Sequence, residues 1–253
     1  MARSPSISAD RPPRGRLSVG TSGFAYPGWS PRFYPAGLKA DGFLSHYAAR
    51  LDAVELNNTY YQSPKADKID LWMAATPDTF RFAVKAQRGG SFRAMSGDPG
   101  ESVAWLTDPY RRFGARLGTV LLYVPGKRID HGRLVAALQA WPRDIPLTME
   151  FPDPSWHVDE TFEALTEAGA ALCATEQPDD ATPPDILRTG PHLYLRLRRH
   201  DYTTPELDAW ADRIEPFLAA GDDAYVFFRH DEVGRGPELA TGLMAAIERR
   251  RPA

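Results

Sequence analysis

Four charged side chains, each late in a short β-rich segment, are the residues of this sequence best placed to do chemistry. They are Glu55 in AVELN (53–57), Lys85 in RFAVKA (81–86), Glu150 in LTMEF (147–151) and Arg196 in HLYLRL (192–197). Carboxylates can act as a general base or nucleophile, and nearby cations can stabilise developing negative charge. Because an unpaired buried charge costs several kcal/mol, these groups should pair with one another. We predict that they form one catalytic site.

The spacing within each segment predicts which side chains meet. Successive side chains of a strand alternate between two faces, so residues two apart share a face. By this rule Glu55 lies with Asn57, while Val54 and Leu56 point the other way. The rule also groups Arg81, Ala83 and Lys85; Thr148 and Glu150; Tyr194 and Arg196; and Tyr225, Phe227 and Arg229. We expect these faces to line one interior, with the late charges at its mouth.

An anionic small molecule is the ligand that these cations favour. A guanidinium matches two oxygens of a phosphate or carboxylate, so Arg196 and Arg229 are expected to bind the anion together with Lys85. His230 follows Arg229 in AYVFFRH (224–230) and is assigned to substrate binding as well.

The remaining polar residues supply the other roles of such a site. Glu55 or Glu150 would act as general base, and Asn57 and Tyr61 would orient the substrate. The sequence does not specify the bond broken. The alternative is a catalytically silent protein that senses a metabolite or docks a partner.

Other chemistries have weaker support in the sequence. Two Glu residues are typical of glycosidases, but cations beside them would keep both ionised and disfavour a general acid. His200, Asp201, His230 and Asp231 could approach a metal, yet no HxH or HExxH spacing supports ligation, so we assign no metal and no cofactor.

Two further alternatives concern the thiol and the basic segments. Cys173 could pair with His192 or His200, but its apolar setting, ALCAT, indicates a packed thiol. Nucleic acid is a possible but less favoured partner. The segments RGGSFR (88–93), LRLRRH (195–200), FFRH (227–230) and GRG (234–236) would interleave cations with aromatics on loops.

The order of predicted elements defines the fold class. β-rich runs alternate with helical patterns, as in parallel βα units. The runs are 17–21, 53–57, 81–86, 119–124, 147–151, 171–175, 192–197 and 224–230, and helices are expected at 38–50, 65–75, 101–115, 132–141, 161–168, 206–219 and 237–250. Eight such units predict an α/β protein with a single (β/α)8 barrel of TIM type and a site at the strands' C-terminal ends. An open Rossmann-type sheet is disfavoured, because no GxGxxG motif follows the first run.

Composition sets the wider limits. The chain has 253 residues, 43% of them hydrophobic, and a net charge of −3, so nothing attracts it globally to nucleic acid or an anionic membrane. We expect residues 1–15 to be a disordered basic leader and residues 16–253 to be one domain. A single cysteine and the lack of a membrane-spanning apolar run lead us to expect a cytoplasmic protein with no membrane partner. The oligomeric state stays open.

Five motifs together resemble those of the YecE-like group, domain of unknown function 72. They are GTSGFAYPGWSPRFYP (20–35), VELNNTYYQSP (54–64), FRFAVKA (80–86), MEFPDPSW (149–156) and YLRLRRHDY (194–202). The resemblance implies a TIM-type barrel with a polar pocket and no agreed activity. It maps recurring polar positions onto Trp29, Glu55, Asn57, Tyr61, Lys85, Glu150, Trp156 and Arg196, which adds Trp29 and Trp156 to the substrate-binding residues.

The chain also departs from the pattern of that group. Pro152-Asp153 stand where Arg-His is usual, Arg198-Arg199 stand where His-Gly is usual, and Arg229-His230 replace an Asn pair. QRGGSFRAM follows the third run in place of a segment that leads to Thr-His. Two of these changes bring Arg to the mouth, which favours a more anionic ligand or the loss of the original chemistry.

Overall fold

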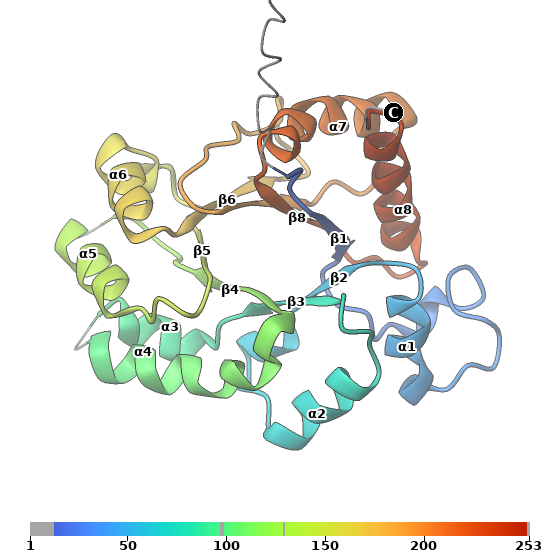
Figure 1. Cartoon of the computed structure of the whole chain (residues 1–253), viewed down its shortest axis with the longest axis horizontal. Coiled ribbons are helices and arrows are strands. Elements are labelled where there is room, and N and C mark those ends of the chain that lie inside the picture. The colour runs from blue at the N-terminus through green and yellow to red at the C-terminus, as the bar shows by residue number, and fades with distance from the viewer. Residues whose placement is uncertain (1–12, 97–98, 129, 252–253) are drawn as a thin grey trace, which may run out of the picture.

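The computed structural model describes residues 13–96, 99–128 and 130–251. Within them, eight parallel strands form a nearly closed barrel with helices around its outside (Figure 1). The strands are β1 (Leu17–Thr21), β2 (Ala53–Leu56), β3 (Arg81–Lys85), β4 (Leu117–Tyr123), β5 (Leu147–Glu150), β6 (Ala171–Glu176), β7 (His192–Leu197) and β8 (Asp223–Phe228). The helices are α1 (Phe43–Ala48), α2 (Ala66–Ala74), α3 (Arg88–Ala94), α4 (Pro99–Thr107), α5 (His131–Ala140), α6 (Asp159–Ala168), α7 (Thr204–Ala219) and α8 (Arg235–Glu248). The predicted (β/α)8 barrel is confirmed.

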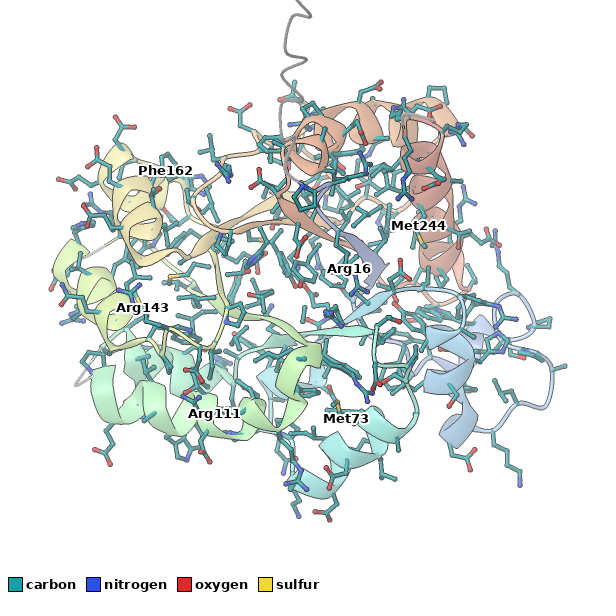
Figure 2. The ribbon with its side chains drawn as sticks, viewed as in Figure 1. Arg16, Met73, Arg111, Arg143, Phe162 and Met244 are labelled. Atoms are coloured by element: carbon teal, nitrogen blue, oxygen red, sulfur yellow. The ribbon has the colours of Figure 1, made fainter. Side chains whose placement is uncertain are left out.

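The two faces of each strand divide as the period of two predicts. Val54 and Leu56 of β2 pack outward into the core between strands and helices. The inward residues form a second buried cluster, which consists of Ala53, Ala83, Leu121, Cys173, Tyr194, Tyr225 and Phe227. Figure 2 shows side chains on both sides of the strand ring, with Met73 of α2 and Met244 of α8 in the outer layer. The inner cluster closes the barrel below the polar residues at its mouth.

The ring has one joint that is not a continuous backbone ladder. The strands pair in the order β1-β8-β7-β6-β5-β4-β3-β2, and β1 meets β2 only through an isolated bridge between Ser22 and Glu55. The hydroxyl of Tyr47 fills the rest of this joint, because it accepts from the Thr21 N–H at 2.8 Å and donates to the Ala53 carbonyl at 2.9 Å. A buried α1 side chain therefore closes the barrel.

Gly20 makes the close approach at this joint possible. A Cβ on Gly20 would lie 1.8 Å from the Ala53 carbonyl oxygen and 2.7 Å from the Tyr47 hydroxyl. Only glycine lets the two strands come this close.

One helix was not expected from the sequence, and it overturns a loop assignment. RGGSFR was expected on a mouth loop, but residues Arg88–Ala94 form α3. The Gln87 side chain caps this helix by accepting from the Gly90 N–H at 2.7 Å, and α3 packs along α4. Two glycines weaken the local helix signal, so cap and packing decide the structure.

The predicted leader is described only at its end. Residues 1–12 lie outside the described part of the chain. Arg14 pairs with Glu215 of α7, and the Gly15 N–H donates to the Leu218 carbonyl at 2.8 Å, so residues 14 and 15 contact the barrel. Among the described residues, no helix has the length and apolar character needed to cross a membrane.

Candidate functional site

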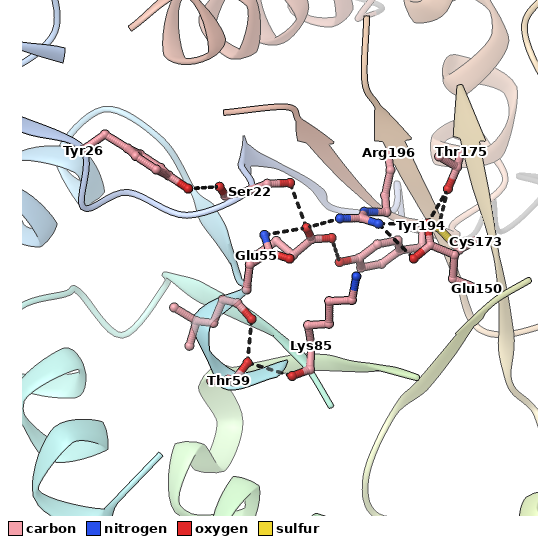
Figure 3. A network of polar contacts seen from close by, with 12 residues as sticks. Ser22, Tyr26, Glu55, Thr59, Lys85, Glu150, Cys173, Thr175, Tyr194 and Arg196 are labelled. Atoms are coloured by element: carbon pink, nitrogen blue, oxygen red, sulfur yellow. Dashed lines mark hydrogen bonds and ion pairs between the residues drawn. The ribbon is translucent and has the colours of Figure 1, made fainter. Parts of the chain in front are cut away.

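A buried ionic cluster joins three of the four predicted catalytic residues at the C-terminal ends of the strands (Figure 3). Nη1 of Arg196 on β7 donates to both carboxylate oxygens of Glu150, each at 2.8 Å. Nη2 of Arg196 donates to Oε1 of Glu55 at 2.9 Å. Glu55 is 0% exposed, and Glu150 and Arg196 are each 4% exposed. The predicted convergence of these three residues is confirmed.

Glu55 is held by four donors. They are Arg196, the Tyr194 hydroxyl at 2.7 Å, the Ser22 hydroxyl at 2.8 Å and the Asn57 amide at 3.0 Å. Burial raises the pKa of Glu55, but the Arg196 charge, the two hydroxyl donors and the Lys85 charge outweigh burial and lower it to about 2. A carboxylate fixed in this way is a poor proton acceptor, so Glu55 is better suited to positioning Arg196 than to general base chemistry.

Glu150 is the carboxylate that faces open space. It ends β5 and accepts from the Thr175 hydroxyl at 2.9 Å as well as from Arg196. Glu150 lines the large cavity at the mouth of the barrel, whereas Glu55 lies behind that wall. Of the two predicted bases, Glu150 is therefore the one with access to a ligand.

Lys85 ends β3 and points toward the cluster without joining it (Figure 3). Its ammonium lies over the rings of Tyr60 and Tyr123, 4.8 Å and 4.5 Å from their centroids. No described residue forms an ion pair or hydrogen bond with this ammonium, so the expectation that all four charges are mutually paired is wrong for Lys85. The reason is that Arg196 already occupies both carboxylates. Burial and the Arg196 charge together lower the pKa of Lys85.

Arg198 is a second unpaired cation, and the sequence prediction does not include it among the site residues. It follows β7, is half-buried and lines the same cavity as Lys85. Its guanidinium has no hydrogen-bond or ion-pair partner in the part of the chain that the structure describes. Burial and the Arg196 charge lower its pKa. The alternation rule could have identified it, because residues 196 and 198 share a face.

The cavity at the mouth, which we call the chamber, has a volume of about 1070 Å³. The predicted site residues in its wall are Asn57, Tyr61, Lys85, Glu150, Arg196 and His230. The segment 177–191 between β6 and β7 forms part of its wall and contributes the exposed side chains of Asp180, Asp185 and Leu187. The buried end of the chamber thus combines one accessible carboxylate with two unpaired cations.

Three predicted substrate-binding residues do not line the chamber. Trp29 is fully buried among aromatic rings, and its Nε1 donates to the Asp231 carbonyl at 2.7 Å, so its role there is packing. Trp156 is 4% exposed and borders a neighbouring cavity. Arg229 lines a separate cavity of about 200 Å³ and lies 3.3 Å from the His200 ring.

The residues considered for a metal site are engaged elsewhere. Asp231 accepts from three backbone N–H groups at the start of α8, and Asp201 pairs with Arg235. The ring of His230 stacks on Tyr26 with centroids 4.9 Å apart. Among the described residues, no group of three or more His, Cys, Asp or Glu side chains is arranged to hold a metal ion.

The thiol alternative also fails on geometry. Cys173 lies in the inner cluster, where its Sγ is 3.3 Å from the Thr175 hydroxyl. His192 instead contacts Thr148 at 2.9 Å, and His200 contacts Arg229 at 3.3 Å, so neither forms a nucleophile pair with Cys173. Burial raises the pKa of the Cys173 thiol.

Eight parallel strands with a charged chamber at their carboxyl ends define an α/β barrel of TIM type. The chain belongs to the family described as protein of unknown function DUF72, whose family model matches residues 18–253. This confirms the resemblance seen in its motifs. The family description carries no activity or substrate.

Relatives support the same assignment along most of the chain. The UPF0759 protein YunF of Bacillus subtilis (strain 168) is 22% identical over 262 residues, which cover 87% of this chain and 93% of YunF. The crystal structure of a DUF72 family protein (TM1631) from Thermotoga maritima has a TM-score of 0.81 at 25% identity, covering 92% of this chain and 99% of that one. A DUF72 family protein (EF0366) from Enterococcus faecalis V583 has a TM-score of 0.76 at 19% identity, covering 92% and 95%.

Proposed function

We propose that the chamber binds a small anionic molecule, with a phosphate or carboxylate group, and acts on it chemically. The observation that carries this proposal is the pair of unpaired cations, Lys85 and Arg198, in the wall of a cavity of about 1070 Å³. Keeping two cations unpaired near Arg196 is unfavourable, as their lowered pKa values indicate. A bound anion would supply the missing negative charge and relieve this cost.

The roles of the remaining residues follow from their positions. Glu150 faces the anion and would remove a proton from the substrate. Arg196 lies beside Glu150 in the chamber wall, and its guanidinium charge could stabilise negative charge that develops there. Glu55 would hold Arg196 in place, and Asn57 would link Glu55 to the chamber wall. The expected location of the protein is the cytoplasm, where phosphorylated metabolites occur.

Binding can be tested by thermal-shift screening and titration calorimetry with phosphate- and carboxylate-bearing metabolites. We expect anions to raise the melting temperature of the wild-type protein. Lys85→Met and Arg198→Met should each weaken binding at least about tenfold, because each removes a charge-assisted contact. Lys39→Met, which removes an exposed lysine away from the chamber, is the matched control. Equal anion binding by wild type and both chamber variants would refute the proposal.

Turnover separates the enzyme from a sensor. For any metabolite that binds, Glu150→Gln should keep binding within a fewfold and abolish turnover, because the amide cannot accept the proton. Binding without turnover in the wild-type protein would instead favour a metabolite-sensing barrel.

Nucleic acid is less well supported as a ligand than a small anion. Within the segment 195–200, Arg196 is buried and Arg199 pairs with Glu206 at 2.7 Å. On α3, Arg93 stacks over Trp105, 4.9 Å from the ring centroid. These cations therefore do not form a free stripe along which a phosphate backbone could bind.

A further inference from the structure

A second cavity adjoins the chamber and has a different character. It has a volume of about 760 Å³ and lies between α3 and the end of β4. Its wall includes the aromatic or apolar side chains of Tyr60, Tyr61, Phe92, Met95, Tyr123, Val124, Pro125 and Trp156. Charged side chains such as Arg88, Lys127 and Arg133 also contribute to its wall. Pockets of this size hold small-molecule ligands, and we call this one the aromatic annex.

The annex and the chamber share two wall residues, Tyr61 and Tyr123. Lys85 lies at the same junction, because its ammonium is 4.5 Å from the Tyr123 ring, which lines both cavities, and 4.8 Å from the Tyr60 ring, which lines the annex. An anion bound to Lys85 is therefore next to the entrance of the annex.

The other directions available to such a ligand are closed by packing or carry negative charge. Below the site, the inner cluster of the barrel is fully packed by side chains that include Tyr194 and Phe227. On the side of segment 177–191, the exposed carboxylates of Asp180 and Asp185 line the same wall as Leu187. The annex instead offers the exposed aromatic side chains of Tyr61 and Phe92 next to Lys85.

Two exposed aromatic side chains in the annex wall also need an explanation. Phe92 is 70% exposed and Tyr61 is 79% exposed, although both are large and apolar in their ring atoms. Phe92 is placed there by α3, the helix that follows directly after the site lysine on β3. A planar ring bound in the annex would cover both side chains.

From this geometry we infer that the ligand of the chamber is an aromatic anion, whose phosphate or carboxylate binds at Lys85 and Arg198 while its ring lies in the annex. This inference rests on the proposed function and narrows its substrate class. Tyr61 and Tyr123 determine specificity at the junction, and Phe92 contributes the outer wall against which the ring packs.

The test compares matched pairs of anions that differ only in their apolar part. The probes are methyl phosphate with phenyl phosphate, and acetate with benzoate, measured by calorimetry on the full chain. Burying a phenyl ring should make the aromatic member of one pair bind about tenfold to a hundredfold more tightly. The pair that shows this ratio identifies the anionic group as phosphate or carboxylate.

Two variants test whether the tighter binding of the aromatic anion comes from the annex. Phe92→Ser should lower the aromatic-to-small ratio at least about threefold, and Ser96→Trp, which adds bulk at an exposed wall position, should lower it further. Leu71→Ser is the matched control, because Leu71 is 64% exposed on α2 and lines neither cavity. This variant should keep the wild-type ratio.

The possible failures are distinguishable. If anions bind but neither pair shows tighter binding of its aromatic member, the aromatic inference is refuted and the anion site stands. If the ratio is high but neither annex variant lowers it, the ring binds elsewhere and the inference is refuted as well. If no anion of either pair binds, both the inference and the proposed function fail.

Discussion

Arg196 is the residue on which the site depends electrostatically. Its guanidinium is the ion-pair partner of both buried carboxylates, and the described part of the chain offers Glu150 no other cation within ion-pair distance. Removing one partner of a buried ion pair lowers the free energy of unfolding by more than the intact pair contributes to it, because the remaining charges are left uncompensated. The stability of the whole barrel mouth should therefore respond to this residue.

We expect Arg196→Met to destabilise the protein by about 3–5 kcal/mol, since it leaves two buried carboxylates without their ion-pair partner. Urea unfolding monitored by fluorescence would measure the change. The variant that also carries Glu55→Gln and Glu150→Gln should recover part of this loss, because the uncompensated charges are then gone. A loss below about 1 kcal/mol would show that the carboxylates find other compensation.

The positions of individual side chains are predictable from the sequence where the two-residue period of a strand determines which face each side chain occupies. Strand alternation alone places Glu55, Glu150 and Arg196 on one interior surface, as observed. It cannot say which of several charges will pair, and Lys85 remains outside the ionic cluster because Arg196 satisfies both carboxylates. That competition depends on distances across the barrel, which no local pattern contains.

Among the secondary-structure elements, the joint between β1 and β2 differs most from a regular barrel. Tyr47 of α1 takes the place of backbone groups, by accepting from Thr21 and donating to Ala53. Both backbone groups are buried, and a buried polar group without a partner costs about 1–3 kcal/mol. A helix side chain is thus part of the hydrogen bonding that holds the strands together.

Removal of this one hydroxyl tests its contribution. Tyr47→Phe should lower the free energy of unfolding by about 1–3 kcal/mol, because the Thr21 N–H and the Ala53 carbonyl lose their partner. Tyr61→Phe is the control, since the Tyr61 side chain is 79% exposed and its hydroxyl can bond to water. Equal stability of the two variants in chemical denaturation would contradict this role.

The elements themselves were largely predictable, and the exceptions have a physical cause. All eight strands lie within two residues of their predicted positions, because short β-rich runs alternate with helical patterns along the chain. Helix α3 was missed, since its stability comes from the Gln87 cap and from packing on α4, which RGGSFRA does not reveal. The role of Tyr47 was also not predictable, because a tyrosine in a helical pattern indicates only that its ring packs against apolar neighbours.

For the molecule as a whole, acid should weaken the fold in two successive ranges of pH. Burial of His192 lowers its pKa from 6.5 to about 4, so the unfolded chain binds this proton before the folded protein does. The pKa of Glu55 is lowered from 4.5 to about 2, so the contribution of Glu55 to stability is complete above pH 4.5. This contribution is lost as the pH falls from 4.5 to about 2. Stability is therefore expected to fall from about pH 6.5 downward.

The His192 step can be isolated by mutation. Between about pH 6.5 and pH 4 the wild-type free energy of unfolding should fall by about 3 kcal/mol through this group alone. His192→Gln can keep the contact with Thr148 and should flatten the profile in that range, whereas His200→Gln, at an exposed position, should not. An unchanged profile in His192→Gln would show that His192 does not control this range.

The joint between β1 and β2 also couples the shape of the barrel to its site. Glu55 is bonded across the joint to Ser22 and, on its other side, to Arg196 of β7. If the ring widened at this split, the Glu55 carboxylate could follow only one of these neighbours. The Glu55 carboxylate thus links the joint of the barrel to the placement of the buried guanidinium, so a change at one should be felt at the other.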